Sequence, residues 1–183
     1  GVTLTITGTY NPATCFIQND GTIRLQGGAL QSFPGTNASV ISMNNLIINN
    51  AFGVNLNKSI NVTGILTLTN GAFTVGANTL TINNPIAGTV ANLSANNTSS
   101  ITVAGTAAGV NIPASVSQLN NLTVSNTIGS SLQGNMKVFG TLFITATAGN
   151  VDADLFTLDG TGNLTMNGGN LIMAKNGVVL PEL

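Results

Sequence analysis

Residues 60–82 read INVTGILTLTNGAFTVGANTLTI, and this stretch decides the fold. Apolar residues alternate with polar ones in short runs; the apolar positions are Ile60, Val62, Leu66, Leu68, Phe73, Val75, Leu80 and Ile82. Alternation with a period of two is the pattern of a β-strand that buries one face. The Gly and Asn residues between the runs suit tight turns. The stretch therefore predicts several short strands joined by turns.

These strands recur with a short, regular period. The spacing is 20 from Leu46 to Leu66, 20 from Ile60 to Leu80, and 17 from Leu56 to Phe73, with slack that a turn absorbs. A solenoid requires such a period because each strand stacks on its counterpart in the neighbouring coil. We therefore expect an all-β fold, a parallel β-helix (a three-sided, right-handed β-solenoid) with about 20 residues per coil. Roughly nine coils at strand spacing would form a rod about 40 Å long.

A longer repeat contains the short one. Residues 43–82 align without a gap with residues 119–158. Identical pairs include Asn44/Asn120, Asn45/Asn121, Leu46/Leu122, Asn50/Asn126, Gly53/Gly129, Gly64/Gly140 and Leu66/Leu142. An ungapped register with matching glycines indicates an internal duplication rather than chance similarity.

The duplication favours one domain over residues 1–183, with an irregular N-terminal part at about residues 8–35. An antiparallel β-sandwich is the competing architecture, since it also has regularly spaced short strands. Asn70-Gly71 and Asp159-Gly160 would suit its hairpin turns. A sandwich, however, does not predict a short period nested inside a longer repeat, and the solenoid is favoured.

Charged residues make up only 5% of the chain, against about 25% in average soluble domains. The net charge is -1 and the mean hydropathy is +0.37, a combination that argues against disorder. Nucleic-acid binding is not expected, because the four basic residues are scattered singly. Membrane insertion is not expected either, since polar residues interrupt every apolar run before it reaches about 18 residues.

The chain lacks most of the residue types that catalytic sites use. Histidine is absent, which removes Ser-His-Asp and Cys-His catalysis and any His-based metal site. Asp152 and Asp154 could place two carboxylates on one side of a strand, a weak Ca²⁺ candidate. Solvated turn residues are the simpler interpretation, because no full ligand set surrounds them. We expect no enzyme and no cofactor.

The outward strand positions suggest two further interpretations. Rows of Thr, such as Thr79 and Thr81, raise the possibility of an ice-binding surface. The aligned positions vary, with Leu155 opposite Thr79, and Thr is in any case a good strand residue. Outward apolar residues, namely Ile47, Phe139, Phe143 and Leu155, would instead mark a protein contact or a local shift of register.

Both ends of the sequence look like uncapped strands. The apolar residues expected at an interface between subunits are Val2, Leu4, Ile6, Leu171, Met173, Val178 and Leu180. Solenoids need polar terminal caps, and open strand edges recruit other strands. End-to-end stacking of copies is a heterologous contact, which produces open filaments.

Three segments carry a resemblance to known proteins: LNNLTVSN (119–126), GILTLTNGAFTVGANTLTI (64–82) and GTGNLTMNGGNLIM (160–173). They resemble the strand-rich arrays of large secreted or cell-surface repeat proteins, adhesin-like, of Bacteroidetes-type bacteria. The resemblance covers about residues 20–175. It implies an extracellular or cell-surface location and work as an adhesin or scaffold.

We therefore expect a non-catalytic extracellular structural protein, a subunit of a fibre that assembles from copies of itself. The alternative is a segment of a larger surface adhesin, or a glycan-binding module that holds surface glycans through Asn, Gln and Thr. An ice-binding protein and a polysaccharide-degrading solenoid enzyme are the less favoured interpretations. Few aromatic residues are available to stack on sugars, and this disfavours the glycan-binding interpretation.

Overall fold

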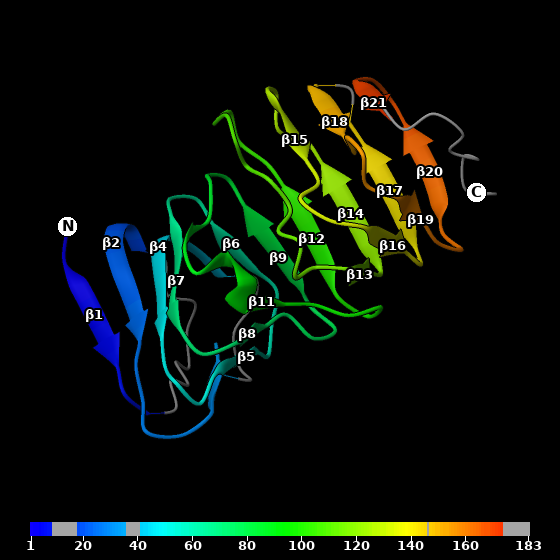
Figure 1. The fold of residues 1–183 in the computed structure, drawn as a ribbon. Helices are drawn as coiled ribbons and strands as arrows, with labels where there is room; N and C mark the ends of the chain where they lie inside the picture. Colours follow the sequence, from blue (N-terminus) through cyan, green and yellow to red (C-terminus); the bar gives the residue numbers. More distant parts are fainter. Residues whose placement is uncertain (9–17, 36–40, 146, 174–183) are drawn as a thin grey trace.

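A computed structural model describes residues 1–8, 18–35, 41–145 and 147–173 (Figure 1). Apart from one 3-10 turn, η1 (Val90–Asn92), the regular structure in these residues consists of β-strands. All strand pairs there are parallel, and they stack in about 8 coils of about 20 residues. The predicted parallel β-solenoid is thereby confirmed. Its handedness and its number of sides stay predictions.

The largest sheet has 11 strands and runs from one end of the molecule to the other (Figure 1). Its members are β1 (Thr3–Ile6), β2 (Gln18–Leu25), β4 (Ile41–Asn49), β6 (Ile60–Val62), β7 (Leu66–Asn70), β9 (Thr79–Ile82), β10 (Ala87–Gly88), β12 (Ser100–Val103), β14 (Asn121–Val124), β17 (Thr141–Ile144) and β20 (Asn163–Met166).

Three smaller sheets complete the coils. The first contains β3 (Gln31–Phe33), β5 (Val54–Leu56), β8 (Phe73–Thr74) and β11 (Leu93–Ser94). The second contains β13 (Gln118–Leu119), β16 (Met136–Val138) and β19 (Leu158–Asp159). The third contains β15 (Gly129–Ser131), β18 (Asn150–Asp152) and β21 (Asn170–Ile172).

The pairing confirms the short period and corrects two other expectations. Leu46 lies beside Leu66, as the spacing predicts. Phe73, however, pairs with Val54 rather than with Leu56, so this step also is close to a full coil. Residues 18–35, in the part expected to be irregular, contain β2 and β3, which corrects that expectation for the described residues.

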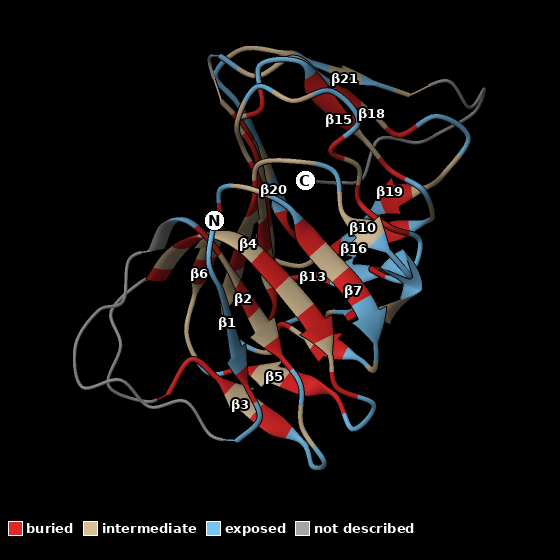
Figure 2. Ribbon diagram, turned by 90° about the vertical axis from the view of Figure 1, so that its left-hand side faces the viewer, coloured by how far each residue is buried: buried red, intermediate tan, exposed pale blue. Residues whose placement is uncertain are grey.

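The core is a set of aliphatic ladders that run along the axis of the solenoid. In β9, for example, Leu80 and Ile82 are buried, while Thr79 and Thr81 are partly exposed. Buried residues alternate with more exposed ones along the strands in the same way (Figure 2). Each buried side chain therefore packs on its counterparts in the coils on either side, and burial of this apolar surface drives folding.

The large sheet divides at β4. The first half of this strand pairs with β6 and the second half with β7. The division arises because residues 63–65 interrupt the next coil with a turn, so that one long strand faces two short ones. From β6 the sheet continues through β9 and β12 to β14, β17 and β20, whereas from β7 it reaches only β10.

The duplication is a repeat of local structure, but it is displaced around the coil. When residues 43–82 are laid on residues 119–158, β6 falls on β16 and the second half of β4 falls on β14. The stack beneath β14, however, consists of β12, β9, β6 and the first half of β4. Two strands that are equivalent in the duplication therefore lie in neighbouring stacks around the coil, not in the same stack. The physical reason is that the step from one copy of the duplication to the other is not a whole number of coils.

Candidate functional site

The N-terminal edge of the solenoid is strand β1. Within the described residues only β2 pairs with it. Its inward-facing residues become less buried toward the start of the chain: Ile6 is 8% exposed, Leu4 37% and Val2 77%. The end of the aliphatic core is therefore partly uncovered at this edge.

Hydrogen bonds show which backbone groups of β1 point away from the rest of the molecule. The Val2 carbonyl accepts a bond from the Thr22 amide at 2.9 Å, and the Ile6 carbonyl accepts an equivalent bond from the Gln26 amide at 2.9 Å. In a parallel pair, a residue that bonds the neighbouring strand does so through both of its backbone groups, and the next residue points the other way. The amides and carbonyls of Thr3 and Thr5 therefore point outward along the axis.

The C-terminal edge consists of β20 and β21. In the part of the chain that the structure describes, β20 pairs only with β17, and β21 only with β18. Met166 is 42% exposed and Ile172 is 38% exposed. Leu171 and Met173 are partly buried and pack against the core. This edge, like the first, combines apolar side chains with a strand that has a neighbour on one side.

At the C-terminal edge, the backbone groups that point away from the neighbouring strand belong to residues with inward-facing side chains, whereas at the N-terminal edge they belong to Thr3 and Thr5. The Asn163 amide donates to the Gly140 carbonyl at 2.7 Å, and the Asn167 amide donates to β17 at 2.9 Å. The backbone groups of Leu164 and Met166 therefore point away from β17. These two residues have inward-facing side chains, since they pair with buried residues of β17.

The two edges are complementary in this respect. Throughout the solenoid, residues with inward side chains on one coil bond residues with outward side chains on the next, as Val2 does with Thr22. At the C-terminal edge, the free backbone groups belong to residues with inward side chains, Leu164 and Met166. At the N-terminal edge, they belong to residues with outward side chains, Thr3 and Thr5. A C-terminal edge placed on an N-terminal edge would thus continue the same ladder.

Of the residues predicted at a subunit interface, the structure places two groups at opposite edges. Val2, Leu4 and Ile6 lie in or beside β1, and Leu171 and Met173 lie in or beside β21. Two others, Val178 and Leu180, lie outside the described residues. The only helix among the described residues, η1, lies in the middle of the chain rather than at either edge.

The Asp152 and Asp154 pair forms a turn. The Asp152 carboxylate accepts a hydrogen bond from the Asp154 amide at 2.8 Å, and Asp154 has a positive φ of 48°. Asp commonly caps its own turn in this way. Among residues 1–8, 18–35, 41–145 and 147–173, no group of three or more His, Cys, Asp or Glu side chains could hold a metal ion.

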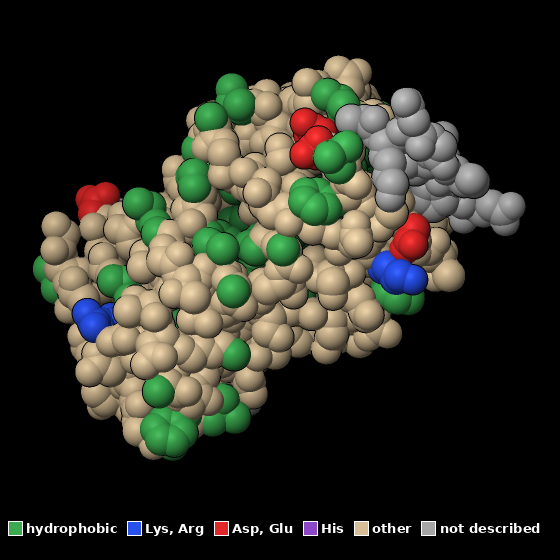
Figure 3. Space-filling model, in the orientation of Figure 1, with side chains coloured by type: hydrophobic (Ala, Val, Ile, Leu, Met, Phe, Trp, Pro, Cys, Tyr) green, Lys and Arg blue, Asp and Glu red, His purple; other side chains and the backbone are tan. Residues whose placement is uncertain are grey.

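Charged groups are sparse over the visible surface (Figure 3). Lys137 and Asp159, on neighbouring strands of one stack, approach to 3.8 Å, and both side chains are at least half exposed. An exposed pair of this kind contributes about 0.2–1 kcal/mol at most. It links the adjacent strands β16 and β19.

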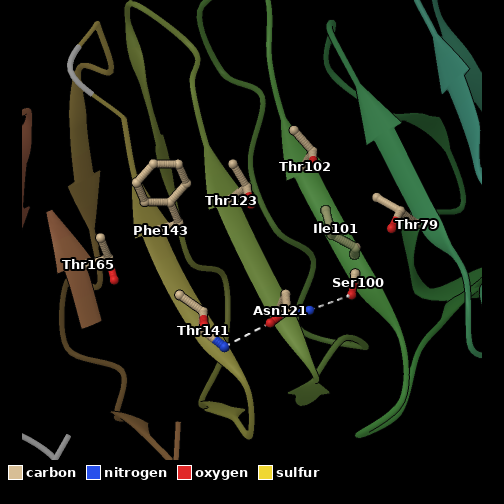
Figure 4. Close-up of a pocket in the computed structure, with 9 residues that line it drawn as sticks. All are labelled: Thr79, Ser100, Ile101, Thr102, Asn121, Thr123, Thr141, Phe143 and Thr165. Carbon is tan, nitrogen blue, oxygen red and sulfur yellow. Dashed lines mark hydrogen bonds between the residues drawn. The ribbon is translucent and has the colours of Figure 1, made fainter. Parts of the chain in front are cut away.

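The outward side chains of β9, β12, β14, β17 and β20 form a second candidate surface, which we call the uncharged face (Figure 4). They form two rows along the axis. The first row is Thr79, Ser100, Asn121, Thr141 and Asn163, and the second is Thr81, Thr102, Thr123, Phe143 and Thr165.

Positions that are equivalent in the duplication, such as Thr79 and Leu155, argue against a regular Thr surface and do not reveal these rows. Those two positions do not share a face, since Thr79 lies in β9 and Leu155 lies in an exposed turn after β18. The neighbour of Thr79 in its row is Ser100, one coil further along the chain. A comparison of positions one coil apart, rather than one duplication apart, is the signal that could have found the rows.

Comparison with protein-family models, with curated proteins and with solved structures found no match. Within the described residues, the structure has no helix long and apolar enough to span a membrane.

Proposed function

We propose that this protein is a non-catalytic structural subunit that assembles head to tail into a filament, with the C-terminal edge of one copy stacked on the N-terminal edge of the next. The observation that carries the proposal is the complementary phase of the two edges. Their outward backbone groups and partly exposed apolar residues would continue the internal ladder without a change of pattern. An extracellular location is part of the proposal and rests on the sequence resemblance alone.

The energetics of such a junction favour assembly. Stacking would bury Val2 and Leu4 on the apolar residues of the C-terminal edge, at about 25 cal/mol for each Å² of apolar surface removed from water. It would also pair backbone groups that otherwise bond water. With a net charge of -1, repulsion between copies is weak. A heterologous contact that does not close on itself produces an open filament.

Two variants that each block one edge test the proposal. Leu4→Lys places a charge in the N-terminal edge, and Leu171→Lys combined with Met173→Lys does so in the C-terminal edge. Each variant alone is expected to remain monomeric by light scattering coupled to gel filtration, since an unpaired charge is costly to bury. An equimolar mixture is expected to form a dimer and nothing larger, because only one junction can form.

The controls put a single lysine on the outward side of the same strands. Thr3→Lys and Ile172→Lys should both still polymerise, because their side chains do not enter the junction. Circular dichroism should show the same β-sheet signal in all variants. Polymers that survive both blocking variants would contradict the head-to-tail arrangement. A wild-type protein that stays monomeric at all concentrations would favour the alternative, a segment of a longer surface adhesin.

A further inference from the structure

The uncharged face contains a shallow, open hollow. It has a volume of about 440 Å³ and extends from β9 across β12, β14 and β17 to β20 (Figure 4). Thr102, Thr123, Phe143 and Thr165 line it in one row, and Ser100 and Asn121 line it in the other. The hollow thus crosses several coils, and a ligand that fits it must be extended along the axis.

One row of the hollow is held by hydrogen bonds within the protein. The Asn121 carbonyl oxygen accepts a bond from the Thr141 amide at 2.8 Å, and its amide nitrogen donates to the Ser100 hydroxyl at 3.3 Å (Figure 4). These bonds hold the Asn121 side chain between the Ser100 hydroxyl of β12 and the Thr141 backbone of β17. Asn121 and Ser100 are therefore the preorganised part of this row, since they lose little freedom when a ligand binds.

The other row offers unoccupied hydroxyl groups. The side chains of Thr102, Thr123 and Thr165 have no hydrogen-bond partner among the described residues of the chain. Each hydroxyl can donate one hydrogen bond and accept others. Thr102 and Thr123 are neighbours at the spacing of parallel strands, about 4.8 Å, and Thr165 lies two strands beyond Thr123. Together they present donors and acceptors at several levels of the solenoid to a ligand with many hydroxyl groups.

Phe143 adds an aromatic surface to this row. It lies between Thr123 and Thr165 in the stack and is half-buried. The face of an aromatic ring carries partial negative charge, which attracts the weakly positive C–H groups of a sugar ring. An aromatic ring between hydroxyl groups therefore matches a sugar, which presents C–H groups on its faces and hydroxyls at its edges.

The absence of charge limits the class of ligand. The five strands of the face carry no Asp, Glu, Lys or Arg. An anionic polymer would find no basic partner here, and nucleic acids require several. We propose that the hollow of the uncharged face binds an extended neutral polysaccharide, with its chain along the solenoid axis. This inference does not depend on filament assembly.

The test is a pull-down with insoluble neutral polysaccharides, microcrystalline cellulose and chitin, and affinity electrophoresis in soluble mannan, starch and laminarin. The wild-type protein should bind at least one of the five. Phe143→Ala, and separately Thr102→Val combined with Thr123→Val, should each weaken that binding about tenfold or more. Valine keeps the branched shape of Thr and removes only the hydroxyl.

Thr67→Val provides the matched control, because Thr67 is an outward residue of β7, away from the hollow. This variant should bind like the wild type. Failure of the wild type to bind any of the five polysaccharides would overturn the proposal, as would undiminished binding by both hollow variants. Thermal hysteresis that is lost in the Thr→Val double variant, without binding to any polysaccharide, would also overturn it and assign the face to ice.

Discussion

At the scale of single residues, two buried asparagines hold the corners of the coils. Asn50 and Asn126 are equivalent in the duplication, and both are fully buried. The Asn126 amide donates to the Ala104 carbonyl at 2.9 Å and to the Ala107 carbonyl at 3.0 Å. Its side-chain oxygen accepts from the Ile128 amide at 2.8 Å. Each such side chain satisfies backbone groups that the turn leaves unpaired.

The sequence predicted these residues only in part. Asn50 and Asn126 form an identical pair in the duplication, and Asn is a residue that tolerates turns. Their complete burial was not predictable from composition or spacing, because Asn is mostly an exposed residue. It follows from the turn around them, in which Gly129 has a φ of 105° and Gly53 has a φ of 90°. Only a residue without a Cβ adopts this conformation at little cost.

Replacing Asn126 with leucine should lower the stability of the protein markedly. Leucine has a similar size but cannot bond the carbonyls and amides around it, which would remain buried and unpaired. We expect the free energy of unfolding in urea to fall by about 3 kcal/mol. Asn97→Leu, at an exposed position, is the control and should change it by less than about 0.5 kcal/mol. Equal effects of the two substitutions would refute the role of the buried amide.

At the scale of elements, the sequence predicts a strand at the N-terminal edge, but it does not predict which backbone groups of that strand point away from β2. The sequence predicts a strand at the start of the chain with Leu4 and Ile6 among its interface residues, and in the structure Ile6 is buried while Thr3 and Thr5 are exposed. Which backbone groups point away from β2 depends on the register of β1 against β2, and only the structure provides that register. The complementary edges are therefore a structural finding, although the apolar residues in them were predicted.

Proline at position 5 tests the backbone part of the junction separately from its side chains. Thr5→Pro removes an amide that points away from β2, so the β1–β2 pairing should survive while pairing with another strand is lost. By sedimentation velocity, we expect this variant to be monomeric at concentrations at which the wild type forms polymers. Thr5→Val keeps the amide and should polymerise normally. Polymers of normal size in Thr5→Pro would show that β1 does not pair with another copy.

At the scale of the whole molecule, periodicity predicted the solenoid, and the duplication misled the comparison of its surfaces. The short period follows from the stacking itself, so the alternation in residues 60–82 was sufficient to predict it. The longer repeat is a duplication of sequence. Strands that are equivalent in the duplication lie at neighbouring positions around the coil, not on the same face. For this reason a comparison of positions one duplication apart hides the rows of the uncharged face, whereas positions one coil apart, such as Thr123 and Phe143, belong to the same row.

The height of the whole molecule predicts the axial repeat of a filament built from it. The path through the large sheet runs over β1, β2, β4, β6, β9, β12, β14, β17 and β20, one strand per level. If β1 of the next copy occupies the following level, each copy adds the height of these strands at about 4.8 Å each, or about 43 Å. A filament of such copies would have parallel strands perpendicular to its axis.

Negative-stain electron microscopy of the purified chain across a concentration series tests filament assembly most directly. We expect unbranched filaments that lengthen with concentration and have an axial repeat near about 43 Å, the height of one copy at strand spacing. Uniform short particles at the highest concentration, with no growth along one axis, would contradict the account.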